Sequence, residues 1–117
     1  MNLLFDFLKH LQPPDKHKVM QIAIKGRSAE VWQMLNGQVA QMQHDRGKIE
    51  TKLGISSAHF DKITSQLLAR CYECLFKDDW YELLSFLSER TAFVKHYYHE
   101  LKRQQHKAEK TFSKKQL

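Results

Sequence analysis

The chain has 117 residues, 42% apolar and 11% aromatic, a composition that supports a hydrophobic core and excludes a wholly disordered chain. Its net charge is +6, of which residues 95–117 contribute +5 through seven Lys or Arg against two Glu, so the first 94 residues are nearly neutral. Two cysteines exclude a disulfide framework and no apolar run reaches the about 20 residues of a membrane-spanning helix, so we expect a soluble, cytoplasmic protein with reduced thiols.

Apolar residues recur every three or four positions through the first part of the chain, which is the spacing of amphipathic helices. Residues 2–11 form the first predicted helix, and the two prolines that follow end it. Residues 15–24 form the second predicted helix, with Gly26 in a left-handed conformation at its end. The third helix begins at Ser28, and its predicted inward residues are Val31, Trp32, Leu35, Val39 and Met42.

The central stretch combines a short helical segment, a glycine turn and a long helix. Residues 48–53 form one or two turns, and Gly54 separates them from a long helix that Ser56 or Ser57 caps and that runs to Phe76. We expect this long helix to lie in the interior, covered by its neighbours on both sides. Its predicted inward residues are Phe60, Ile63, Leu67, Leu68, Cys71, Tyr72, Leu75 and Phe76.

The last part of the chain carries a further helical stripe. Asp79 and Glu82 have the spacing of a capping box, and residues 88–91 are a candidate break in the stripe. Its predicted inward residues are Leu83, Leu84, Leu87, Val94, Tyr98 and Leu101. Since no window alternates with the two-residue period of a strand, we predict an all-α fold of five to seven helices without a sheet, as a compact bundle or a short superhelix. It comprises one domain over residues 1–107 and a basic, flexible tail over residues 108–117, and an alternative is that the chain is part of a longer protein.

The segment Leu53-Gly54-Ile55-Ser56, followed by Phe60 and Ile63, resembles the turn and second helix of bacterial helix-turn-helix regulators. That resemblance implies that residues early in the second helix face the major groove of DNA. Three features differ from the family: the first helix is short, Glu50 stands where a small residue is usual, and Asp61 places an anion near the phosphates. The major-groove residues implied are Ser57, Ala58, His59, Asp61 and Lys62.

Cysteines and histidines supply the candidate chemistry. The pair Cys71 and Cys74 lies near a predicted helix C-terminus, where the helix dipole raises a thiol pKa and disfavours redox catalysis. Together with His96 and His99 they make a conceivable zinc site, but their intervals match no familiar zinc module. The histidine cluster also raises the alternative of acid-base catalysis, but no phosphate loop, nucleophile elbow or convergent carboxylate pair accompanies it. We therefore expect no catalytic, metal or cofactor residues and a non-enzymatic protein.

Large apolar residues are more numerous than a bundle of short helices can bury, which favours a protein partner or a second copy of the chain. We expect a helical protein-protein interaction domain, adaptor or scaffold, whose candidate interface residues are Trp32, Trp80, Tyr81, Tyr97 and Tyr98. The alternative is a helix-turn-helix protein that binds nucleic acid. Its candidate contacts are Ser57, His59 and Lys62 on the bases, with Lys102, Arg103 and Lys107 on the phosphates.

Overall fold

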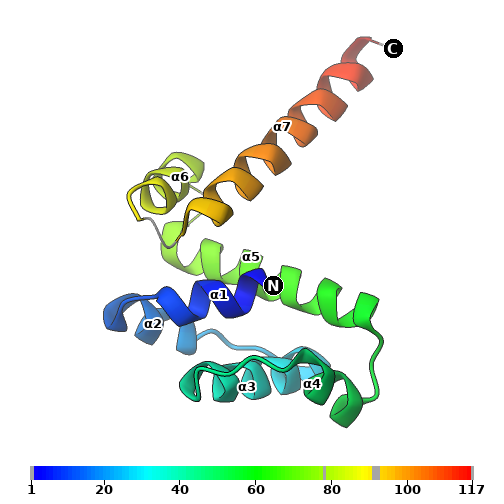
Figure 1. The fold of residues 1–117 in the computed structure, drawn as a ribbon. Helices are drawn as coiled ribbons and strands as arrows, with labels where there is room; N and C mark the ends of the chain where they lie inside the picture. Colours follow the sequence, from blue (N-terminus) through cyan, green and yellow to red (C-terminus); the bar gives the residue numbers. More distant parts are fainter. Residues whose placement is uncertain (1, 78, 91–92, 117) are drawn as a thin grey trace. The chain divides into compact units, whose positions relative to one another are not determined.

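The structure is a computed structural model that describes residues 2–77, 79–90 and 93–116, with side chains in these ranges up to residue 106. Over these residues it contains seven helices and no strand, so the prediction of an all-α fold with five to seven helices is confirmed (Figure 1). The helices are α1 (Leu3–His10), α2 (Pro13–Met20), α3 (Gly26–Ala40), α4 (Arg46–Leu53), α5 (Ser57–Phe76), α6 (Trp80–Ser88) and α7 (Val94–Gln116).

The chain divides into two compact units, Met1–Asp78 with α1 to α5 and Asp79–Leu117 with α6 and α7. This division does not test the prediction of one domain over residues 1–107, and the flexible tail over residues 108–117 also stays a prediction. Across the described residues, no helix combines the length and the apolar character needed to cross a bilayer. The cytoplasmic location stays a prediction.

The core of the first unit forms where α1, α2 and α3 pack against α5 (Figure 1). Phe7, Leu35 and Phe60 are each fully buried, and the ring of Phe7 meets Tyr72 edge to face with ring centroids 5.2 Å apart. Burying one such side chain contributes about 1.5–3 kcal/mol. The long helix α5 is therefore the element against which the first three helices are stabilised.

A polar contact joins the start of α1 to the middle of this core. Asn2 caps α1 by accepting a hydrogen bond from the Phe5 N–H at 3.0 Å. Its side-chain amide also donates to Thr64 Oγ1 of α5 at 3.2 Å, and the Thr64 hydroxyl donates to the Phe60 carbonyl at 3.0 Å. Thr64 is 4% exposed, and the apolar pattern did not identify it as a core residue.

Both predicted ends of the second helix are wrong, and so is the predicted start of the third helix at Ser28. The second helix begins at Pro13 because proline, whose φ is fixed near the helical value, is favoured in the first turn, where its missing N–H costs nothing. It ends at Met20, so residues 22–25 form a linker. Gly26 does adopt a left-handed φ of 66°, but it begins α3 and does not end α2.

Three residues predicted to point inward do not. Met42 lies beyond the end of α3 with a positive φ of 57° and is 64% exposed. In α7, Tyr98 is 64% and Val94 42% exposed. The described residues His96 and Glu100 of the same helix are buried instead. The buried face of α7 therefore includes polar side chains and differs from the predicted one.

The second unit consists of α6 packed against α7. Asp79 caps α6 by accepting a hydrogen bond from the Glu82 N–H at 3.0 Å, so the predicted cap is confirmed. α6 ends at Ser88, where the predicted break over residues 88–91 begins, and residue 91 of that break lies outside the described residues. Leu83, Leu87 and Phe93 are buried. The buried Glu100 accepts a hydrogen bond from Arg103 at 2.6 Å.

Candidate nucleic-acid interface

The connection from α4 to α5 is a three-residue turn. Gly54 adopts φ 64° and ψ 38°, a left-handed conformation that costs a residue with a side chain about 1–2 kcal/mol. The next residue, Ile55, donates its N–H to the Glu50 carbonyl at 3.1 Å. Ser56 then caps α5 by accepting a hydrogen bond from the His59 N–H at 3.1 Å. These contacts pair backbone groups at the end of α4 and at the start of α5.

Apolar side chains on both sides of this turn pack into the first unit. Ile49 of α4 and Phe60 of α5 are fully buried, and Ile63 is 4% exposed. Leu53 and Ile55, which flank the glycine, are half-buried. The resemblance expects the residue after the turn glycine to pack inward, and the helix-turn-helix assignment stays a prediction.

The opposite face of the first two turns of α5 is open to solvent. Ser57, His59 and Lys62 are exposed, as are Ala58 and Asp61. The expectation that α5 is covered by its neighbours on both sides is therefore wrong within the first unit, where α1, α2 and α3 leave this face of its first two turns exposed. All five residues that the resemblance assigns to the major groove lie on the uncovered face.

Arg46, at the start of α4, clamps the two helices together. Its Nε donates to Glu50 Oε1 at 3.0 Å, and its Nη2 donates to Asp61 Oδ1 at 3.0 Å and to the Ser57 carbonyl at 3.2 Å. Its guanidinium lies 4.7 Å from the ring centroid of Phe60, within cation–π range. Burial opposes its charge, but the hydrogen bonds to Glu50 and Asp61 outweigh burial and raise the pKa of Arg46. We call the group formed by Arg46, Glu50, Ser57, Phe60 and Asp61 the Arg46 clamp.

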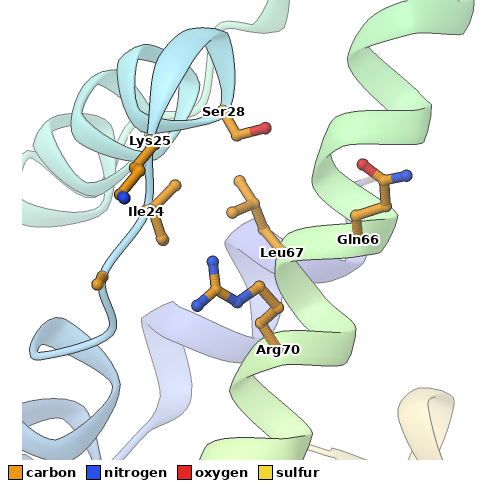
Figure 2. Close-up of a pocket in the computed structure, with 7 residues that line it drawn as sticks. Ile24, Lys25, Ser28, Gln66, Leu67 and Arg70 are labelled. Atoms are coloured by element: carbon orange, nitrogen blue, oxygen red, sulfur yellow. The ribbon is translucent and has the colours of Figure 1, made fainter.

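A basic pocket of about 460 Å³ lies farther along α5, between this helix and the linker that joins α2 to α3. Figure 2 shows Arg70 reaching from α5 toward this linker, with Leu67 beside it. No carboxylate lines the pocket, and in the described part of the chain neither Lys25 nor Arg70 forms an ion pair. We call it the basic pocket, lined by Ala23, Ile24, Lys25, Ser28, Gln66, Leu67 and Arg70.

The two cysteines differ in burial, since Cys71 is buried and Cys74 is half-buried. Burial raises the pKa of the Cys71 thiol to about 12, which keeps it protonated near neutral pH. The Cys74 thiol donates to the Lys18 carbonyl at 3.6 Å. Among the residues that the structure describes, no three His, Cys, Asp or Glu side chains are grouped so as to hold a metal ion.

The predicted protein-interface residues differ in exposure. Trp32 is 6% exposed and belongs to the core of the first unit, so it is not available to a partner. Tyr81 is 79% exposed and Tyr98 64% exposed. Trp80 and Tyr97 are half-buried.

The predicted phosphate contacts lie on α7. Lys102 and Arg103 are exposed, and Arg103 forms an ion pair with the buried Glu100 at 2.6 Å. The side chain of Lys107 lies outside the described residues. Lys102 is therefore the freer of the two described cations.

Our sequence interpretation missed three basic residues that the fold makes prominent: Arg46, Lys25 and Arg70. Two signals were available. Arg46 stands four residues before Glu50, the helical spacing of an ion pair. Arg70 stands eight residues after Lys62 on the same face of a helix, whereas nothing in the sequence pointed to Lys25 as its neighbour.

The chain matches no family model, and no curated protein or solved structure is significantly similar to it.

Proposed function

We propose that the first unit binds duplex nucleic acid, with α4 and α5 acting as a helix-turn-helix. The observation that carries the proposal is the solvent exposure of Ser57, His59 and Lys62 on a helix whose other face belongs to the core. The His59 imidazole supplies a donor or an acceptor for base edges in the major groove, and Lys62 contacts guanine or phosphate. The Ser57 hydroxyl, which donates its hydrogen to Glu50, supplies an acceptor. A recognition helix needs one face packed against the protein core and the other face free to enter the groove.

The contacts of the Arg46 clamp also account for the features that differ from the family. The first helix has a full eight residues, because it begins at Arg46. Glu50 does not intrude as an unpaired charge: Arg46 binds it, and the Ser57 hydroxyl donates to it at 3.3 Å. The Asp61 carboxylate is paired with the same guanidinium at 3.0 Å, which reduces its repulsion of a phosphate.

Binding to a pool of random-sequence duplexes, followed by fluorescence anisotropy over a range of salt concentrations, tests this proposal. We expect affinity to fall as salt rises, because bound cations release counterions from DNA. Lys62→Glu is expected to weaken binding about tenfold or more. Lys18→Glu is the matched control, since Lys18 contacts Cys74, about 18 Å along α5 from residue 62. Equal losses in both variants, or affinity that does not change with salt, would contradict the proposal.

The exposed tyrosines of the second unit support a second candidate function, association with a protein partner or with another copy of the chain. Tyr81 and Tyr98 expose large aromatic surfaces, and such residues dominate the energy of many protein interfaces. Sedimentation velocity over a hundredfold range of concentration tests self-association. Tyr81→Ser with Tyr98→Ser is expected to abolish any dimer, while Met42→Ser, at an exposed residue of the first unit, leaves it unchanged. A monomer at all concentrations excludes the second copy as the partner.

A further inference from the structure

We propose that the basic pocket binds a phosphate group. Two cations from segments far apart in the sequence, Lys25 before α3 and Arg70 in α5, line the same cavity (Figure 2). The Ser28 hydroxyl and the Gln66 amide line it as well, and both groups can donate hydrogen bonds to phosphate oxygens. Guanidinium and ammonium groups with neutral donors are the usual recognition set for phosphate.

The charge of the pocket is not cancelled by its neighbours. Glu30, a carboxylate near the start of α3, is held by Arg27 at 2.9 Å. No acid lines the cavity, and no ion pair joins Arg70 to Glu73 one turn farther along the described helix. Lys25 stands at the N-terminus of α3, where no side chain caps the helix and the dipole adds positive potential. The local field therefore favours an anion.

The size of the pocket indicates more than a free anion. At about 460 Å³ it lies in the range of small-molecule sites, and its apolar lining consists of Ala23, Ile24 and Leu67. This combination fits a phosphorylated molecule of nucleotide size, with its phosphate on Lys25 and Arg70 and its less polar part on Ala23 and Ile24. The same phosphate chemistry is available from the backbone of a duplex bound along α5, because Arg70 lies about 12 Å from Lys62 along one face of the helix.

Titration of the ¹⁵N-labelled full chain with AMP, with inorganic phosphate and with a short duplex, followed by NMR, tests the pocket and separates the two sources. We expect the Lys25, Ser28 and Arg70 amides to shift saturably with AMP, and Arg70→Gln and Lys25→Gln each to weaken binding about tenfold. Lys62→Gln is the matched control on α5 outside the pocket and is expected to leave AMP affinity unchanged. Both pocket residues are exposed and form no ion pair in the described chain, so circular dichroism of the variants should match the wild type.

The outcomes distinguish this proposal from the proposed function. If AMP binds but the duplex does not, the result supports the phosphate site and contradicts the helix-turn-helix function. If only the duplex binds and Arg70→Gln weakens it, the phosphate comes from the nucleic-acid backbone and the site again stands. The proposal is overturned if none of the three probes shifts the pocket amides, or if Arg70→Gln and Lys25→Gln bind every probe as tightly as the wild type.

Discussion

Two arginines beside α5 have opposite surroundings. Arg46 at the α4–α5 turn contacts two carboxylates and an aromatic ring. Arg70, in the second half of the helix, lines a pocket without an acid and forms no ion pair in the part of the chain that is described. A cation whose charge is balanced inside the protein stabilises the fold, whereas an unbalanced cation attracts a ligand at little cost to stability. The Arg46 clamp is thus a structural feature and the basic pocket a binding feature.

The largest effect is expected from the ring beneath Arg46. Phe60 is fully buried at the junction of the clamp and the core. Phe60→Ala leaves a cavity and is expected to lower the free energy of unfolding by about 3–5 kcal/mol, measured by urea denaturation. Gln66→Ala, at an exposed lining residue of the pocket on the same helix, is the control and should change stability by less than about 0.5 kcal/mol. Equal losses would mean that the clamp and the pocket do not differ in their role in the fold.

The turn between the helices allows a test with matched glycines. Gly54 has a φ of 64°, so Gly54→Ala forces a side chain into the left-handed region and should cost about 1–2 kcal/mol of stability. Gly37 lies within α3 with no atom within 4 Å of an added Cβ, so Gly37→Ala should stabilise by about 0.5–1 kcal/mol. Thermal unfolding of both variants measures this difference in sign. A stabilised Gly54→Ala variant would show that the turn is not constrained as described.

The two arginines can be compared directly by the same substitution. Arg46→Met removes two partly exposed ion pairs and the contact with Phe60, which together contribute about 1 kcal/mol after allowance for solvent screening. Arg70→Met should leave stability within about 0.5 kcal/mol of the wild type. Urea denaturation at low and high salt measures both, and salt should weaken only the contribution of Arg46. A larger loss in Arg70→Met would reverse the roles assigned to the two residues.

The helices were predictable because their signals are local. Ser56 caps α5 and Asp79 caps α6 as the sequence indicates, and the apolar spacing of α5 identifies its buried face. The same spacing does not say what the other face meets, and for that reason α5 was expected to be covered on both sides. At Pro13 the pattern was ambiguous, since proline both ends the preceding helix and begins the next.

The site residues were predictable only where the resemblance covered them. Ser57, His59 and Lys62 follow the turn glycine, and the resemblance assigns them to one face. The pairing of Arg46 with Asp61 spans fifteen residues, and the pocket that Lys25 and Arg70 both line joins residues more than forty positions apart. Such contacts depend on how helices pack, which no single-sequence spacing rule encodes.

The smallest expected effect is a pH dependence beside the Arg46 clamp. His44 stacks on Phe5 with ring centroids 4.6 Å apart, and its Nδ1 lies 3.1 Å from Gln38 Oε1. Burial, and then the charge of Arg46, lowers the pKa of His44 from its ordinary value of 6.5. Because the folded pKa lies below the unfolded one, the unfolded chain binds more protons between them, so stability is full above about pH 6.5 and is lost as the pH falls toward the folded pKa.

Urea denaturation at several pH values between about 7.5 and 5.5 measures this loss. We expect His44→Phe, which keeps a ring against Phe5, to flatten the pH dependence. The difference between the two arginines gives the sharper test. Arg46→Met should reduce the pH dependence by removing the second cause of the lowered pKa, while Arg70→Met should leave it unchanged because the Arg70 charge is not among the causes that act on His44. An unchanged pH dependence in His44→Phe would show that another group causes it and would contradict the role assigned to His44.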